Sequence, residues 1–140
     1  MEQRGPLLLR GSTILVVEDD EEARDTARRL LEAFGARVIV AENGRAGLSR
    51  LESVRPHAVL CDLGMPVMDG LEFARRVRRD PRYRGVLLFA LTGWQDQADF
   101  LRTWEAGFDA HLVKPITMEM VRSLAGRLTG QAASGGQSGA

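Results

Sequence analysis

Residues Thr13–Asp20 read TILVVEDD, a short apolar run that ends in three acidic side chains. An apolar run without polar alternation is typical of a β-strand that is buried on both faces. The acidic residues open a second pattern, in which apolar residues recur at helical spacing as far as Phe34, and Gly35 follows. Carboxylates in a first turn and a glycine after the last turn favour a helix over residues 20–34.

The same alternation continues along the chain. Further strands are predicted over residues 37–40, 57–61, 86–91 and 110–113, and further helices over residues 44–54, 71–79, 95–106 and 117–128. Asn43 and Thr117 are the expected caps of two of these helices. Five strands that alternate with five helices predict an α/β fold, a doubly wound parallel sheet with helices on both faces.

The two ends lack this periodicity. We expect a flexible segment over residues 1–11, one domain over residues 12–130, and a disordered tail rich in Gly, Ser and Ala over residues 131–140. Cys61 is the only cysteine, which excludes an internal disulfide and fits a reducing, cytoplasmic setting. The formal net charge of +0 argues against a nucleic-acid surface, and the apolar runs are too short to predict membrane contact.

Polar side chains follow the predicted strands. Glu18 and Asp19 follow the first strand, and Asp62, Thr92 and Lys114 follow the third, fourth and fifth strands. Lys114 is also the only lysine among 19 basic residues. In open α/β sheets ligands bind at the carboxyl ends of the strands, so we expect these groups to converge.

Such a cluster has a chemical meaning. Carboxylates from different strands repel one another unless a cation or protons intervene, and oxygen-only ligands select Mg²⁺ or Mn²⁺. An acidic pocket that also holds an ammonium and a hydroxyl suits the transfer of a phosphoryl group onto a carboxylate. The residues alone therefore predict a Mg²⁺-dependent carboxylate phosphoacceptor or a related phosphatase.

Each of these residues also has a purely structural interpretation. The acidic residues 18–20 could merely stabilise the N-terminus of the first helix, and Asp62 could cap the turn before Met65. Thr92 could be an ordinary strand residue, and Lys114 could be a surface lysine before a proline. All of these interpretations would have to hold together at four strand ends, which favours the site.

Four segments resemble the receiver domains of bacterial response regulators. They are ILVVEDD (Ile14–Asp20), CDLGMPVMDG (Cys61–Gly70), ALTG (Ala90–Gly93) and AGFDAHLVKPI (Ala106–Ile116). They stand in the order and spacing of that family, and the resemblance covers nearly all of residues 12–128. The second segment and the Lys-Pro ending are specific, whereas ALTG alone is not. The resemblance implies a flavodoxin-like sheet with strand order 2-1-3-4-5.

Carried over position by position, the resemblance implies that Asp62 is the phosphoacceptor. Glu18 and Asp19 match the acidic pair that holds Mg²⁺, with Glu18 in a place where Asp is usual. Gly64 matches the position whose backbone carbonyl completes the metal shell.

The resemblance also implies a switch. Thr92 is similar to the hydroxyl that follows the phosphoryl group, and Lys114 to the lysine that pairs with that group. The face formed by the fourth helix, fifth strand and fifth helix is then expected to repack. His111 stands where the family commonly has an inward-turning Tyr or Phe, so it is either a switch residue or a strand histidine without a signalling role. Trp94 either shields the acyl phosphate from water or packs on the fourth helix.

The function implied is that of a receiver domain in a two-component phosphorelay. Its donor would be the phosphohistidine of a histidine kinase or of a histidine phosphotransfer domain. It would promote its own phosphorylation and dephosphorylation and would not be an enzyme. The segment GFDAHLVKP is most similar to receivers of hybrid sensor kinases. A weak phosphorylation-dependent homodimer is a further expectation.

Two alternatives remain open at this point. One is a receiver-like module that binds proteins without phosphorylation. The other is a phosphatase of the haloacid-dehalogenase type, which would require a second aspartate where this chain has Gly64.

Overall fold

Five parallel strands form one sheet at the centre of the molecule. The computed structural model describes residues 7–65, 67–93 and 100–134. The strands are β1 (Thr13–Val17), β2 (Arg37–Ala41), β3 (Ala58–Asp62), β4 (Leu87–Thr92) and β5 (Ala110–Val113), in the order β2-β1-β3-β4-β5. The doubly wound α/β class and the flavodoxin-like strand order are both confirmed.

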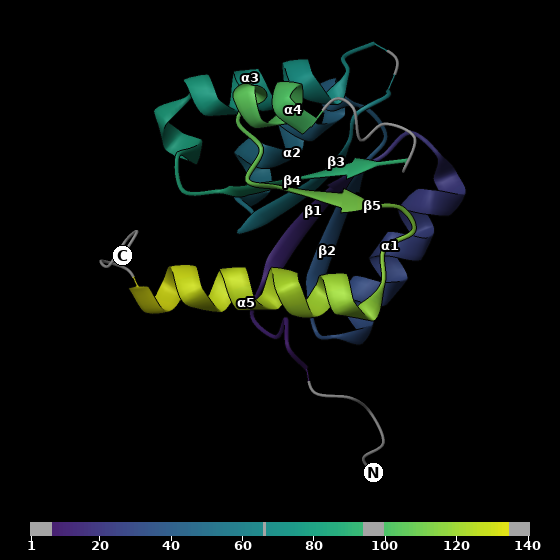
Figure 1. Ribbon diagram of the computed structural model, residues 1–140, viewed down its shortest axis with the longest axis vertical. Coiled ribbons are helices and arrows are strands. Elements are labelled where there is room, and N and C mark those ends of the chain that lie inside the picture. Colours follow the sequence, from purple (N-terminus) through teal and green to yellow (C-terminus); the bar gives the residue numbers. More distant parts are fainter. Residues whose placement is uncertain (1–6, 66, 94–99, 135–140) are drawn as a thin grey trace.

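Helices cover both faces of the sheet. They are α1 (Glu21–Ala33), α2 (Gly44–Val54), α3 (Gly70–Arg79), α4 (Phe100–Ala106) and α5 (Met118–Ser134), with a short 3₁₀ helix, η1 (Pro81–Tyr83), before β4. Figure 1 shows α2, α3 and α4 on one side of the sheet and α1 and α5 on the other. The start of the predicted fourth helix, residues 95–99, lies outside the described residues. None of the helices in the described part of the chain has the length and apolar character needed to cross a membrane.

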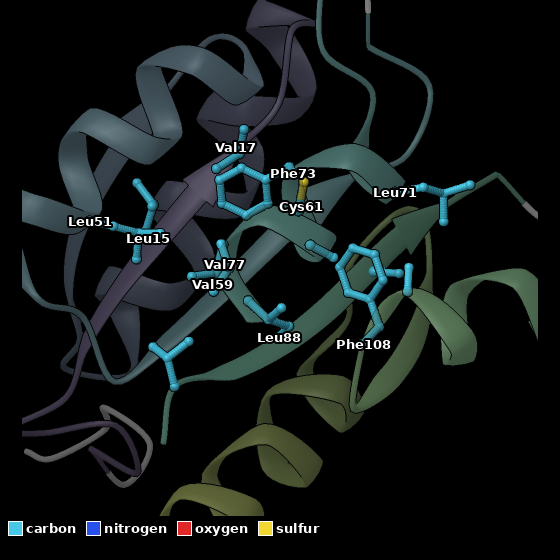
Figure 2. Close-up of a cluster of buried hydrophobic side chains, with 14 of the residues drawn as sticks. Leu15, Val17, Leu51, Val59, Cys61, Leu71, Phe73, Val77, Leu88 and Phe108 are labelled. Carbon is cyan, nitrogen blue, oxygen red and sulfur yellow. The ribbon is translucent and has the colours of Figure 1, made fainter. Parts of the chain in front are cut away.

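Two apolar cores result, one on each face of the sheet. Because neighbouring strand residues point to opposite faces, Leu15 and Val17 join one core while Ile14 and Val16 join the other. Figure 2 shows the first core, in which Phe73 and Val77 of α3 pack onto strand residues. The strands are apolar on both faces because both faces are covered.

Capping side chains define where several helices begin. The carboxylates of Asp20 and Asp69 accept backbone N–H groups of Ala23 and Glu72 at 2.8 and 2.9 Å. Asn43 caps α2 in the same way, and the Thr117 hydroxyl accepts the N–H of Met120 at 3.3 Å. These caps are local in sequence, which is why the helix starts agree with the sequence pattern.

Regular or buried structure extends beyond the expected boundaries at both ends. Leu9 lies inside the segment expected to be flexible, yet its side chain is fully buried, and its N–H donates to the Phe34 carbonyl at 2.8 Å. Helix α5 continues to Ser134, past the expected end at residue 128. Neither feature has a periodic signal in the sequence, because Leu9 is a single apolar contact and the end of α5 is rich in small residues.

Arg78 of α3 braces the end of the molecule where β4 and β5 begin. Its guanidinium donates to the carbonyls of Gly107 and Val86 at 2.9 Å each, and it pairs with Asp109 at 2.8 Å. Asp109 in turn accepts the N–H of Leu88 at 2.8 Å. One planar side chain thus joins α3 to the segments that enter two strands.

We predict that Arg78→Met lowers the free energy of unfolding by about 2–4 kcal/mol, because buried carbonyls and a partly buried carboxylate lose their partner. Urea denaturation measures the change. Arg76→Met is the matched control, since Arg76 makes only an exposed pair with Glu72 and should cost less than about 0.5 kcal/mol. Equal effects of the two substitutions would contradict the bracing role.

Candidate functional site

The site lies at the carboxyl ends of the central strands. Asp62 and Thr92 are the last residues of β3 and β4, and both are held in the ladder, opposite Leu91 and Val113 respectively. Glu18 directly follows β1 and donates its N–H to the Ala41 carbonyl at 3.0 Å. The main chain at each position is therefore fixed by sheet hydrogen bonds before any side-chain contact is made.

Three carboxylates meet at this edge. Oxygen atoms of Glu18, Asp19 and Asp62 all lie within 4.8 Å of one another. Glu18 is 1% exposed and Asp62 is 8% exposed, whereas Asp19 is open to solvent. An all-oxygen set with one accessible member fits a hard divalent cation that keeps some of its water.

Lys114 supplies the positive charge that the cluster needs. Its Nζ lies 2.9 Å from Oε1 of Glu18 and 3.2 Å from Oδ1 of Asp62. The Lys114 N–H donates to the Thr92 carbonyl at 2.8 Å, and the peptide bond between Lys114 and Pro115 is cis. The single ammonium is thus shared between the two buried carboxylates.

The pKa values of these groups respond to burial and to one another. Burial raises the pKa of Asp62; Lys114 and the Gly64 N–H oppose this effect, whereas Asp19 adds to it. Burial likewise raises the pKa of Glu18, against the hydrogen bonds from Lys114 and from the Asp20 N–H. For Lys114 burial acts to lower the pKa, but Glu18 and Asp62 outweigh it and the net direction is upward.

Two further groups complete the surroundings of Asp62. The Thr92 hydroxyl oxygen is buried and has no hydrogen-bond partner within the described ranges. Gly70, the first residue of α3, packs so closely that a Cβ there would lie 2.5 Å from the Asp62 carbonyl oxygen. Gly64 lies in the loop after β3, and a Cβ added there would meet no atom within 4 Å.

The structure brings the sequence-predicted carboxylates together with Lys114, and Thr92 lies buried at the end of β4. Glu18, Asp19, Asp62 and Lys114 form one cluster, and Gly64 contacts it through its N–H. His111 instead lies on β5, where its ring meets the Thr103 hydroxyl of α4. The predicted role of Trp94 falls outside the described residues.

Thr103 was not among the residues predicted from the sequence. A lone threonine in a helical pattern carries no signal of its own, and only the packing of α4 on β5 brings it to the His111 ring. Gly70 was noted only as part of a motif, without its role as the contact between α3 and the Asp62 backbone.

The family model of the response regulator receiver domain matches residues 14–125. The chain belongs to this family. Receiver domains are phosphoacceptors that interact with histidine kinases or phosphotransfer proteins, which agrees with the acidic cluster at the strand ends.

Individual relatives agree with this assignment. An uncharacterised 14.6 kDa protein of Leptolyngbya boryana is 40% identical over 78% of this chain and 84% of its own length. The response regulator MprA of Mycolicibacterium vanbaalenii is 38% identical over 76% of this chain, which spans only 45% of that longer protein. The receiver domain of a Pseudomonas aeruginosa sensor histidine kinase, solved with a magnesium ion in its active site cleft, is 30% identical with a TM-score of 0.77. That match covers 86% of this chain and 98% of the solved one.

We predict that Gly70→Ala in this receiver domain lowers the free energy of unfolding by about 2–3 kcal/mol, because the added methyl group collides with the backbone of Asp62 and Leu63. Urea denaturation measures the effect. Gly64→Ala is the control, since its methyl group would meet open space and should change stability by less than about 1 kcal/mol. A larger loss in Gly64→Ala than in Gly70→Ala would overturn the packing argument.

The raised pKa of Asp62 leads to a pH-dependent prediction. A carboxyl group whose folded pKa exceeds its unfolded value stabilises the fold fully below the unfolded pKa, about 3.9 for Asp, and loses this contribution as the pH rises through the folded pKa. We therefore expect Asp62→Asn to be more stable than the wild type at pH 7 in EDTA, with a difference that shrinks toward pH 4.

Asp80→Asn provides the control of opposite sign. Hydrogen bonds from Arg82 lower the pKa of Asp80, so its contribution is present above the unfolded pKa and is lost as the pH falls. Urea midpoints between pH 4 and pH 8 should show this variant to be less stable than the wild type at pH 7. If the stability differences of the two variants from the wild type changed with pH in the same direction, the opposite pKa shifts of Asp62 and Asp80 would be contradicted.

Proposed function

We propose that this receiver domain accepts a phosphoryl group on Asp62 from the phosphohistidine of a histidine kinase or of a histidine phosphotransfer domain. The observation that carries the proposal is the shared ammonium. Nζ of Lys114, the only lysine, lies 3.2 Å from Oδ1 of Asp62, a residue that is largely buried but still 8% exposed. The histidine kinase receiver among the structural relatives supports this class of donor.

Glu18, Asp19, Asp62 and the backbone carbonyl of Gly64 are the groups proposed to hold Mg²⁺, or Mn²⁺. Their support is the oxygen-only donor set within 4.8 Å for the three carboxylates, together with the raised pKa values of the two buried ones, which a second positive charge would reverse. When bound, the cation would neutralise the oxygens of the incoming phosphoryl group.

The transfer itself needs little from the protein beyond position and charge. A carboxylate oxygen of Asp62 forms the new P–O bond while the P–N bond of the phosphohistidine breaks. The imidazole leaves with the electron pair of that bond and takes up a proton from water. Lys114 then exchanges its contact with the Asp62 oxygen for one with a phosphoryl oxygen, while Glu18 keeps it in place.

The proposed output is a change on the face formed by α4, β5 and α5. The Thr92 hydroxyl is buried at the end of β4 and free to donate to a phosphoryl oxygen, as far as the described residues extend. A movement of the Thr92 side chain toward the phosphoryl group would open space on the α4 side of the sheet, where His111 is the proposed switch residue. The two states would differ in packing and not in fold.

The domain would act as a phosphoacceptor that assists its own phosphorylation and dephosphorylation, without turnover of a substrate. Its proposed setting is cytoplasmic, with a kinase or phosphotransfer partner and no nucleic acid, and placement within a hybrid sensor kinase is the form the P. aeruginosa relative suggests. A weak dimer of the phosphorylated form is part of the same proposal.

The test is the mass of the intact protein after incubation with acetyl phosphate, with Mg²⁺ or with EDTA. We expect one phosphoryl addition that requires Mg²⁺ and is absent in Asp62→Asn. Asp69→Asn, which keeps the cap of α3, is the matched control and should be phosphorylated like the wild type. No addition to the wild type would favour the binding module without phosphorylation, and release of phosphate without an adduct would favour a phosphatase.

A further inference from the structure

A buried hydroxyl of α4 contacts the one histidine of β5. Thr103 is 2% exposed, and its Oγ1 lies 3.1 Å from Nε2 and 3.4 Å from Nδ1 of His111. Because Thr103 is buried, the edge of the His111 ring that lies near its hydroxyl faces α4, and His111 as a whole is half-buried. The contact joins α4 to β5 through two residues that are eight positions apart in the chain.

The same contact lies on the face of the sheet that carries Thr92. His111 is paired with Ala90 in the ladder, and Val113 is paired with Thr92. Since alternate residues of a strand share a face, the side chains of Ala90, Thr92 and His111 all point to the α4 side. A movement of the Thr92 hydroxyl and a movement of the His111 ring would therefore take place under the same helix.

We propose that Thr103 is a positioning residue that holds the His111 ring inward and thereby sets the balance between the two states of the switch. The proposal rests on the switch role proposed for His111. A rotation of the ring toward solvent breaks the hydrogen bond, so the bond favours the inward state. A neutral hydrogen bond of ordinary net strength shifts a two-state population by roughly fivefold.

The Thr103 hydroxyl can form a hydrogen bond with the His111 ring, in addition to the packing between the two side chains. A threonine hydroxyl both donates and accepts, so it matches either tautomer of a neutral imidazole. Valine has the same shape without the hydroxyl, and serine keeps the hydroxyl without the methyl group. The three side chains at position 103 therefore separate the hydrogen bond from the packing of α4.

The chain contains a second histidine that serves as an internal control. His57 lies at the opposite end of the sheet, where its Nδ1 accepts the backbone N–H of Thr13 at 3.0 Å. Its ring should not respond to any change at position 103.

The experiment records long-range ¹H–¹⁵N spectra of the histidine rings in the unphosphorylated protein. We expect Thr103→Val to change the tautomer balance and the ¹⁵N shifts of His111, Thr103→Ser to match the wild type, and His57 to stay constant in all three. Unchanged His111 signals in Thr103→Val would overturn the proposal, as would equal changes in the valine and serine variants.

A double-mutant cycle tests the same contact through the stability of α4. Backbone amide hydrogen exchange at residues 102–106 should accelerate by roughly fivefold in Thr103→Val and in His111→Phe, and the double variant should exchange no faster than either single one. Fully additive effects would mean that the two side chains act separately and would refute the pair. Neither measurement uses phosphorylation, so a failure of the acetyl phosphate test leaves this result readable by itself.

Discussion

The shared ammonium of Lys114 is the interaction on which the site depends. Three carboxylates within 4.8 Å would repel one another strongly in a partly buried position, and burial already raises the pKa of two of them. One positive charge, 2.9 and 3.2 Å from the buried pair, lowers that cost without abolishing it. The site is left short of positive charge, which is the condition under which a divalent cation and an anionic phosphoryl group bind together.

The rest of the fold fixes the backbone that carries these charged side chains. Strand pairing fixes the main chain up to Asp62 and Thr92, and Gly70 lets α3 begin directly against the Asp62 backbone. At the other end of the sheet, Arg78 satisfies its own charge with carbonyls and Asp109. The charge of Arg78 is therefore matched by a carboxylate, whereas at the site three carboxylates share one ammonium, which marks the site as the candidate for chemistry.

On the α4 side of the sheet, the Thr103 hydroxyl adds a polar contact to the apolar packing. The Thr103 hydroxyl lies within 3.4 Å of both ring nitrogens of His111, so it can favour the inward position of the ring, which a methyl contact could not do through a hydrogen bond. In this way a small side chain on a helix is proposed to influence a residue of β5. At the site, Glu18 holds the Lys114 ammonium through a contact of 2.9 Å.

The sequence alone determined the order of the elements, the caps at Asn43 and Thr117, and the groups at the strand ends. These features follow from local periodicity and from the rule that parallel strands end at one edge, so Glu18, Asp62 and Lys114 could be placed together in advance. Only the tertiary structure decided the burial of Leu9, the brace at Arg78 and the meeting of Thr103 with His111. The contacts of Leu9 and Arg78 join residues far apart in the chain, and the contact of Thr103 with His111 forms only because α4 packs on β5. No pattern within a short stretch of residues encodes that packing.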